Sequence, residues 1–451
     1  MEEKMVENLL SVIWVVRSGQ NLESDLIALE RMLAGRSAEL IIVDDVDGEE
    51  LSISDASPST QVLHHDHARG PAASFAEGVR VAHGNRILYI ESPFILQPSG
   101  LAALERVLLR DPHVGLVGPV QTGVSHNRVR MMPDYQDLDG MNDFARRVEK
   151  RYRGKVTQEL LHDDGCFLVR RAALRDVQPD TGFQTSQGMA GDFSLRLWQA
   201  GWKVLAADDV YVHRNATGVA EDFTADSRRF HELHGFDISY STNVRRDALT
   251  ELDSSHAPQA VLEAGCAAGG TLCYLQGAFP EAELYGIELN DRAAAVARLF
   301  ADVQAMDLEK LDHPAWHDKF DVILMCDILE HLRDPWQTVR NMYRMTRPGG
   351  RIVISVPNIT YIGVFSEMLH GQWTYEDSGI LDRTHLRFFT CATAQQLLTQ
   401  AGWRIRKVDW TVLPYRQEHL QSLEQKLLPL LGADMEQRNL EAYQWVIVGE
   451  K

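Results

Sequence analysis

Short apolar runs alternate with helical patterns in two separate series along this chain of 451 residues. In the first series, the apolar runs lie at residues 10–16, 39–45, 87–90, 114–118, 166–170 and 203–207. Helical patterns, such as those at 22–33 and 100–109, lie between them. Strands that alternate with helices are typical of a mostly parallel sheet with helices on both faces. The first half is therefore predicted to be an α/β domain.

The alternation begins again at Ala260, after a polar and charged segment that we interpret as a partly helical linker. The second series has helical patterns at 291–303 and 335–346, and its apolar runs lie at 260–265, 283–289, 320–327, 351–357, 403–410 and 443–450. A chain of this length is too long for one ordinary domain. We therefore predict two doubly wound α/β domains, at residues 9–220 and 258–451, with the linker at 221–257.

The composition indicates which binding partners and which cellular compartment fit this protein. A net charge of -19 argues against a nucleic-acid partner, because no basic stripe is present to replace counterions. The five cysteines are scattered without a C-x-x-C pair, which is typical of reduced thiols in the cytoplasm. The first ten residues lack the features of a signal peptide, and no apolar run approaches the roughly 18 residues of a membrane span. We expect a cytoplasmic protein, with peripheral attachment to the inner face of the cell membrane left open.

The clearest candidate site begins at VLEAGCAAGG, residues 261–270. An apolar strand is followed at once by small residues, which let the backbone turn sharply and approach a ligand. Glu288 ends the next predicted strand, about twenty residues later, at a spacing that suits a carboxylate binding ribose hydroxyls. These two features fit either NAD or S-adenosylmethionine as the cofactor.

Three later motifs decide between the two cofactors: FDVILMCDILEHLRDP at 320–335, RPGGRIVISVPN at 347–358 and GILDRTHLRFFT at 379–390. The glycine loop is G-C-A-A-G rather than G-x-G-x-x-G. With these motifs, residues 258–451 resemble a class I S-adenosylmethionine-dependent methyltransferase with a Rossmann-like seven-stranded fold. They are most similar to the branch found with the synthesis of bacterial cell-surface polysaccharides and glycans.

The resemblance implies a role for each matching position. The methionine part of the cofactor would be surrounded by Glu263, Gly265, Ala267 and Gly269. Glu288 would bind the ribose, Asp307 and Leu308 would bind the adenine, and Asp327 would close the site at the end of the fourth strand. The family usually has glycine where Ala267 stands. Because alanine adds no polar group, we expect cofactor affinity to survive this departure.

Methyl transfer to a hydroxyl requires alignment of the acceptor and a base that removes its proton. The candidate bases are His331 in the EHL segment and His385 in the RTHLRFF segment, with Asp382 close in sequence. Each histidine also has a structural interpretation, as packing on the cofactor loop for His331 and as a lid anchor for His385. The stretch 358–386 is a long aromatic-rich insertion, which predicts a lid or substrate wall or else a small satellite core.

The first half, at residues 9–215, resembles a family 2 glycosyltransferase with the GT-A nucleotide-sugar fold. The resemblance depends on the order of four segments: IIVDD at 41–45, residues 70–92, GCFLVRR at 165–171 and residues 191–214. It implies that Asp44 and Asp45 meet the nucleotide, that Glu91 holds the first position of the D-x-D metal site, that Asp192 is the catalytic base, and that His213 is a metal or diphosphate ligand.

Departures from the glycosyltransferase pattern put sugar transfer in doubt. The D-x-D motif is replaced by Glu91-Ser92-Pro93, and proline cannot bind a metal. A later acid is replaced by Ser194. A diphosphate leaving group without Mn²⁺ or Mg²⁺ needs other charges, which residues 87–96 do not supply. HHDH at 64–67 could mimic a metal site, but we interpret it as a polar strand end. We expect a domain that has lost or weakened sugar transfer, although some transferases of this fold work with an incomplete D-x-D.

Our main hypothesis is a methyltransferase that uses S-adenosylmethionine to methylate a sugar hydroxyl of a bacterial surface glycan or its precursor. One alternative is a bifunctional enzyme with an active sugar-transfer site that binds Mn²⁺ or Mg²⁺ with a nucleotide sugar. Another is a non-catalytic assembly module of a glycan-synthesis complex. A small-molecule methyltransferase of the quinone-synthesis kind shares the EHL segment, but the long insertion and the attached first domain argue against it. The expected partners are a sugar-containing acceptor and other glycan-synthesis enzymes.

Overall fold

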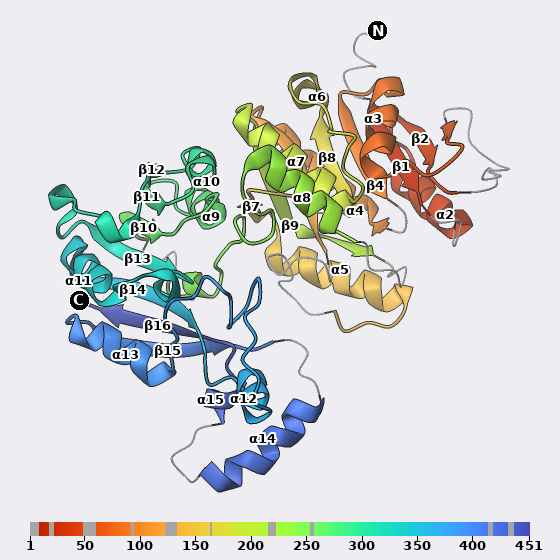
Figure 1. The fold of residues 1–451 in the computed structure, drawn as a ribbon. Coiled ribbons are helices and arrows are strands. Elements are labelled where there is room, and N and C mark those ends of the chain that lie inside the picture. Colours follow the sequence, from red (N-terminus) through yellow and green to blue (C-terminus); the bar gives the residue numbers. More distant parts are fainter. Residues whose placement is uncertain are drawn as a thin grey trace. The chain divides into compact units, whose positions relative to one another are not determined.

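The computed structural model describes residues 9–17, 22–47, 60–91, 94–121, 133–162, 165–214, 222–252, 257–413, 418–431 and 437–451. The chain divides into two compact units, Met1–Asn243 and Val244–Lys451 (Figure 1). The segment interpreted as a linker is shared between them, since helix α8 (Thr224–His234) belongs to the first unit and the short helix η1 (Ala248–Glu251) to the second. Ser92 and Pro93 of the damaged motif lie outside the described residues, as do linker residues 221 and 253–256.

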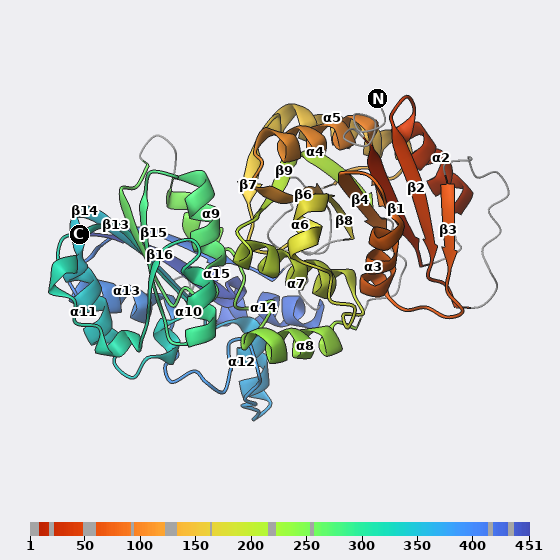
Figure 2. The ribbon, with the colours of Figure 1, turned by 90° about the horizontal axis from the view of Figure 1, so that it is seen from above.

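The first unit contains a mixed nine-stranded sheet in the order β3-β2-β1-β4-β8-β6-β9-β5, with β7 paired to β9. Figure 2 shows β3, β2, β1 and β4 side by side. The strands are β1 (Leu10–Val16), β2 (Ala38–Asp44), β3 (Thr60–His64), β4 (Arg86–Glu91), β5 (Phe94–Leu96), β6 (Val114–Gln121), β7 (Val156–Gln158), β8 (Cys166–Arg170) and β9 (Lys203–Arg214).

The prediction of a mostly parallel sheet is wrong for part of the first unit. Strands β3, β2, β1 and β4 are mutually parallel, but β8 runs antiparallel to both of its neighbours, β4 and β6. A strand that is buried on both faces has the same continuous apolar run in either direction. The pattern CFLVR therefore located β8 correctly but contained no signal for its direction.

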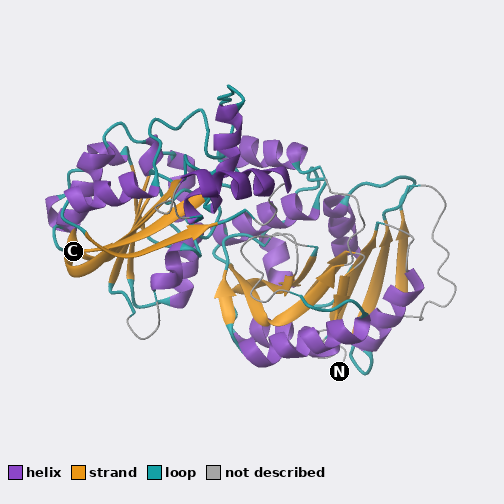
Figure 3. Ribbon diagram, turned by 90° about the horizontal axis from the view of Figure 1, so that it is seen from below, coloured by secondary structure: helices purple, strands orange, loops and turns teal. Residues whose placement is uncertain are grey.

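Helices cover both faces of this sheet (Figure 3). On one face, α2 (Leu22–Leu33) packs against α4 (Pro98–Arg110), and their leucines join Trp14 and Leu88 in one apolar core. On the other face, α3 (Pro71–Val81) packs against α7 (Ser186–Gln199) through a cluster of aromatic rings. The remaining helices are α5 (Leu138–Tyr152) and α6 (Arg171–Asp176).

The second unit contains a seven-stranded sheet in the order β12-β11-β10-β13-β14-β16-β15. The first five strands in this order are parallel, and β16 is antiparallel to both β14 and β15. The arrangement is the predicted Rossmann-like sheet. The strands are β10 (Ala260–Ala264), β11 (Glu283–Glu288), β12 (Asp302–Ala305), β13 (Phe320–Cys326), β14 (Thr346–Pro357), β15 (Arg404–Thr411) and β16 (Gln444–Glu450).

Side-chain caps start several helices of the second unit. Asn290 accepts hydrogen bonds from the first backbone amides of α10, Asp334 caps α11, and Thr390 forms a capping box at α13. The predicted helix 291–303 is too long, because α10 ends at Ala297 and β12 begins at Asp302. Short apolar stretches fit a helix or a strand equally well. The helices are α9 (Gly270–Ala278), α10 (Asp291–Ala297), α11 (Pro335–Met345), α12 (Ile362–Leu369), α13 (Cys391–Gln400), α14 (Glu418–Leu431) and α15 (Arg438–Glu441).

The insertion at 358–386 contributes to the predicted satellite core, and its role as a lid or substrate wall stays a prediction. Tyr361 and the α12 residues Ile362 and Val364 are buried in a satellite core with Leu420 of α14, whereas Trp373 and Tyr375 are 41% and 53% exposed. One end of the insertion therefore builds structure, and the other presents aromatic rings to solvent. Within the described residues, no helix has the length and apolar character needed to cross a membrane.

Candidate functional site

The loop after β10 turns through three residues in the left-handed region of backbone space. Gly265, Ala267 and Gly269 have φ angles of 75°, 47° and 83°. A Cβ on Gly265 would lie 2.9 Å from Ile328, and one on Gly269 would lie 2.8 Å from the Cα of Ala297. Glycine is therefore required at the first and third of these positions by both conformation and space. Ala267 adopts the same region at a cost of roughly 1 kcal/mol.

Glu263 stands at the end of β10, immediately before this loop. Its side chain is buried, and Oε2 has no hydrogen-bond partner among the described residues. Burial raises the pKa of Glu263 to about 8, although a hydrogen bond with Thr271 and the charge of Arg245 act in the opposite direction. Buried polar atoms are normally satisfied, so an unpaired carboxylate oxygen beside a glycine loop fits a cationic ligand group.

Glu288 joins the end of β11 to the same loop. Its Oε2 accepts a hydrogen bond from the backbone N–H of Ala267 at 2.8 Å, and its Oε1 accepts one from Asn290 N at 2.8 Å. Each carboxylate oxygen can accept a second bond. Glu288 is therefore oriented by the backbone and still able to bind two hydroxyls.

The predicted adenine residues follow β12. Asp307 accepts a hydrogen bond from Glu309 N and so begins a single helical turn, and Leu308 is buried behind it. The unpaired oxygen of Glu263, the glycine cradle and the acid at the end of β11 together fit S-adenosylmethionine, which has a cationic end and a ribose.

Asp327 lies just after β13 in the left-handed region, with a φ of 52°. Its carboxylate forms an ion pair with Arg245 at 2.5 Å and accepts hydrogen bonds from Ser355 Oγ at 2.7 Å and from Gln444 Nε2. Arg245 also binds Asp247 and Ser355. The sequence analysis missed Arg245, because an arginine in a charged segment at the start of a domain has no distinguishing signal.

A second group of polar residues lies on the segment that follows β13 and on the end of the insertion. Glu330 and His331 belong to a short helix, η5 (Leu329–His331), and His385 lies near the end of the insertion. The backbone N–H groups of Leu386 and Arg387 donate to the carbonyl oxygen of Glu330, at 2.7 and 3.0 Å. These bonds bring the two predicted histidines together, with their ring centroids 4.8 Å apart.

Thr384 connects Asp382 to His331. Its hydroxyl donates to Asp382 Oδ1 at 2.6 Å and lies 3.2 Å from His331 Nδ1. His385 Nδ1 lies 2.9 Å from the carbonyl oxygen of Ile380. All three predicted base candidates are therefore neighbours, and each is held by a specific contact.

The sequence analysis did not select Glu330 or Thr384, although Glu330 belongs to the quoted EHL segment and Thr384 to the RTHLRFF segment. Glu330 is only 1% exposed, and neither carboxylate oxygen has a hydrogen-bond partner among the described residues. Burial, and then the charge of Asp327, raise its pKa well above the usual range. Burial and the nearby His385 lower the pKa of His331.

In the first unit, each of the two acids at the end of β2 contacts a histidine side chain. Asp44 Oδ2 lies 3.1 Å from His64 Nδ1, and Asp45 Oδ1 lies 3.1 Å from His65 Nδ1. Asp45 also accepts hydrogen bonds from the backbone N–H groups of Arg69 and Gly70. The HHDH segment therefore ends strand β3 with polar pairs.

The other two predicted acids of the first unit also have internal partners. Glu91 is buried, forms an ion pair with Arg17 at 2.7 Å and accepts a hydrogen bond from the Ser186 hydroxyl. Asp192 is 1% exposed, with Oδ2 bound by Arg196 and Oδ1 lying 2.9 Å from His234 Nε2.

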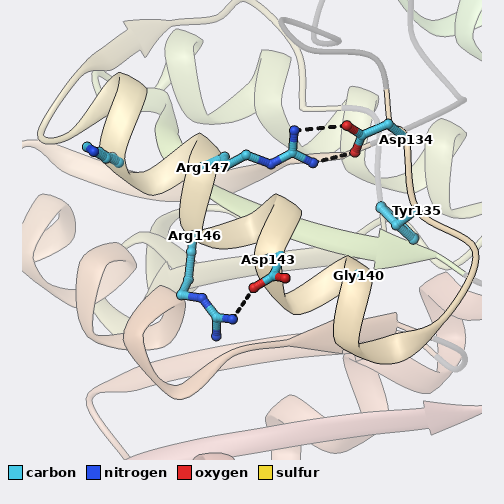
Figure 4. Close-up of a pocket in the computed structure, with 7 residues that line it drawn as sticks. Asp134, Tyr135, Gly140, Asp143, Arg146 and Arg147 are labelled. Carbon is cyan, nitrogen blue, oxygen red and sulfur yellow. Dashed lines mark hydrogen bonds and ion pairs between the residues drawn. The ribbon is translucent and has the colours of Figure 1, made fainter.

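A surface pocket of about 500 Å³ lies beside α5 in the first unit (Figure 4). Its wall consists of Asp134, Tyr135, Gly140, Asp143, Arg146, Arg147 and Lys150. Arg146 and Arg147 each pair with a carboxylate of this wall. The Tyr135 hydroxyl contacts His213 Nδ1, so this predicted sugar-transfer residue is one contact removed from the pocket wall. The other residues predicted for sugar transfer do not line it.

Comparisons with known proteins agree with the geometry of the second unit. A family model described as a methyltransferase domain matches residues 230–408. The Ubiquinone biosynthesis O-methyltransferase of Aeromonas salmonicida (strain A449) is 27% identical over 195 residues, which is 42% of this chain and 81% of that protein. The enzyme of the same description from Aromatoleum aromaticum is 29% identical over 187 residues, which is 40% of this chain and 75% of that protein. A solved S-adenosylmethionine dependent methyltransferase from Mesorhizobium loti is 17% identical, with a TM-score of 0.32 over 46% of this chain and 96% of that one.

Proposed function

Because the second unit carries a class I S-adenosylmethionine-dependent methyltransferase domain and makes the chain a methyltransferase, we propose that the acceptor atom is a hydroxyl oxygen of a sugar. When bound, S-adenosylmethionine supplies an electrophilic methyl group on its sulfonium. Glu263 and the glycine loop would hold its methionine part, and Glu288 would hold its ribose. The remaining task of the protein is to place the acceptor and remove its proton.

The group formed by Glu330, His331, His385, Thr384 and Asp382 is the observation that carries this proposal. A hydroxyl is a poor nucleophile until its proton is removed, so an O-methyltransferase needs polar groups beside the methyl donor that promote the loss of this proton. Glu330 and His331 follow β13, as does Asp327 of the cofactor site, and the other three residues of the group come from the insertion. Asp382, Thr384 and His331 form a chain of contacts that orients the imidazole. This arrangement supports transfer to oxygen.

The exposed rings of the insertion support a sugar as the acceptor. Trp373 lies edge-on to Phe388 at 5.6 Å, and Phe388 lies 6.4 Å from the His385 ring. An aromatic wall therefore extends from solvent to the histidine pair. Apolar walls with a few convergent polar groups are typical of small-molecule sites. Aromatic faces suit the C–H faces of sugar rings, and surface glycans and their precursors are the sugars that we expect.

The test is methyl transfer from labelled S-adenosylmethionine by the full chain, with two acceptor panels. One panel contains monosaccharides, nucleotide sugars and glycan fragments, and the other contains catechols and related phenols. We expect label in the sugar panel as an alkali-stable methyl ether. Label only in the phenol panel would overturn the sugar assignment, and label on nitrogen or carbon would overturn transfer to oxygen.

A phenolic acceptor is the second candidate, and one observation favours it. The relatives described as Ubiquinone biosynthesis O-methyltransferases are 27% and 29% identical to this chain over most of their length. The same aromatic wall would also accept a phenol ring. The two acceptor panels distinguish the candidates directly.

For the first unit, we propose that sugar transfer is lost or weakened and that the unit binds the glycan acceptor or supports the methyltransferase. The internal partners of Glu91 and Asp192 support this, because a carboxylate held by arginine is less available as a metal ligand or base. Calorimetric titration with UDP, GDP and dTDP, with Mn²⁺ or Mg²⁺, tests it against S-adenosylhomocysteine as a positive control. Metal-dependent binding of one nucleotide would instead favour a bifunctional enzyme.

A further inference from the structure

We propose that Glu330, His331 and His385 bind one divalent transition-metal ion, and that this ion takes the acceptor hydroxyl as a further ligand. Each residue offers one ligand atom, and the three atoms lie within 4.8 Å of one another. Among the described residues, this is the group of histidine, cysteine or acidic side chains that meets such a distance. The role of the ion in methyl transfer rests on the proposed function, but its binding does not.

The Glu330 carboxylate is the first argument for a cation. It is buried, and neither oxygen has a hydrogen-bond partner among the described residues. A buried carboxylate is normally paired with a cation, hydrogen-bonded or bound to a metal. Ligand atoms of His331 and His385 lie within 4.8 Å of this carboxylate and can share an ion with it. A metal would satisfy the carboxylate at the point where the three ligand atoms converge.

The two histidines are oriented as metal ligands usually are. A metal-binding imidazole generally donates its second N–H to a carbonyl or a carboxylate, which fixes the ring and leaves the other nitrogen for the metal. The carbonyl oxygen of Ile380 accepts from His385 Nδ1. Thr384 gives its own hydroxyl proton to Asp382, so its oxygen accepts from His331 Nδ1. Both rings are therefore set with Nε2 as the lone-pair nitrogen.

The ligand set indicates the class of ion. Two imidazole nitrogens and one carboxylate oxygen suit Zn²⁺, Fe²⁺, Co²⁺ or Mn²⁺ better than Ca²⁺ or Mg²⁺, which prefer oxygen ligands. A tetrahedral ion with bonds of about 2.1 Å holds its ligand atoms roughly 3.4 Å apart. The separation of up to 4.8 Å would therefore contract on binding. Three protein ligands leave a position open.

The open position has a defined use in methyl transfer. A hydroxyl bound to a divalent ion loses its proton far more readily, as bound water does when its pKa falls from 15.7 to about 7. The acceptor O–H bond breaks and its proton passes to water. A lone pair of the resulting oxygen forms the new O–CH₃ bond while the S–CH₃ bond breaks, and that electron pair remains on sulfur. No oxidation or reduction occurs, so a redox-inert ion such as Zn²⁺ is sufficient.

The binding test uses the full chain after removal of metals with a chelator. Zn²⁺ is titrated by calorimetry, and Co²⁺ is added separately because its visible absorption reports nitrogen and oxygen ligands in a tetrahedral site. We expect one ion per chain, and we expect Glu330→Gln and His385→Ala each to weaken Zn²⁺ binding at least about 100-fold. His317→Ala is the matched control, since His317 is an exposed histidine of the same unit. S-adenosylhomocysteine binding reports that each variant is folded.

The outcomes separate this inference from the proposed function. If the folded wild-type chain binds Zn²⁺ no more tightly than Glu330→Gln, the metal site is refuted, whatever the methylation assay shows. If the chelated enzyme and Glu330→Gln both methylate a hydroxyl at the wild-type rate, the catalytic role of the ion is refuted while the proposed function stands. If Zn²⁺ binds as expected but no hydroxyl acceptor is methylated, the site stands and the proposed function fails.

Discussion

Protonation of Glu263 makes the stability of the cofactor-free second unit depend on pH. Burial raises the pKa of this carboxyl to about 8, against a usual value of 4.5. Between these two values, the unfolded chain has lost the proton and the folded chain keeps it. The unfolded state therefore binds fewer protons, and the free energy of unfolding falls as the pH rises from about 4.5 to about 8. Above that range the dependence ends.

The size of the effect follows from the difference in pKa. A difference of roughly 3.5 pKa units corresponds to about 5 kcal/mol over the whole range, at about 1.4 kcal/mol per unit. Between pH 5 and pH 7, the free energy of unfolding should therefore fall by roughly 3 kcal/mol. Glu263→Gln keeps the shape of the protonated side chain and cannot ionise, so it should remove this part of the pH dependence of the free energy of unfolding. A cationic cofactor group bound beside Glu263 should also reduce this pH dependence.

The assay is urea unfolding of the wild type and Glu263→Gln at pH 5, 6, 7 and 8. Because the chain has two units, the relevant transition is the one that S-adenosylhomocysteine shifts to higher urea. Glu283→Gln is the matched control, because the Glu283 pKa is lowered by Tyr285 and Lys319 and this acid stays ionised throughout the range. Parallel pH profiles for the wild type and Glu263→Gln would refute the reasoning, since they would mean that folded Glu263 is already ionised at pH 5.

Three further predictions concern the same unit. Glu288→Ala should weaken binding of S-adenosylhomocysteine roughly 10- to 100-fold by calorimetry, because charge-assisted hydrogen bonds to the ribose are lost. The control variant Glu283→Ala, at the other end of β11, should bind as the wild type does. Equal affinities of Glu288→Ala and the wild type would disprove the ribose assignment. Ala267→Gly should raise the free energy of unfolding by up to about 1 kcal/mol, because glycine adopts a positive φ without strain, and a loss of stability in urea would contradict this. His385→Ala should slow methyl transfer at least about 100-fold while cofactor affinity stays within about twofold, as expected for a group that acts on the acceptor; an unchanged turnover number would exclude His385 from the reaction.

Much of the second unit could be predicted because local rules specify it. A short apolar run followed at once by glycine is typical of a strand end, and glycine at 265 and 269 permits the positive φ angles that this loop adopts. The resemblance to class I methyltransferases then predicted the seven-stranded sheet. The boundary of helix α10 was mistaken because the apolar run that includes Val303 fits two periods.

Other features depend on residues that are distant in sequence. Glu330 becomes an unpaired buried carboxylate only because Leu386 and Arg387 bring the insertion back over its helical turn. Asp192 matches a catalytic base by its position in the sequence, and only the structure shows that Arg196 and His234 contact its two oxygens.

The sequence by itself located most of the longer strands, the sharp turn after β10 and the side chains that could do chemistry, because these properties follow from the residue and its near neighbours. Only the tertiary structure decided the direction of β8, the ion pair of Arg245 with Asp327 and the meeting of Glu330 with His331 and His385. Burial and pairing are set by residues from elsewhere in the chain. They decide whether a carboxylate is a ligand, a base or part of an internal ion pair.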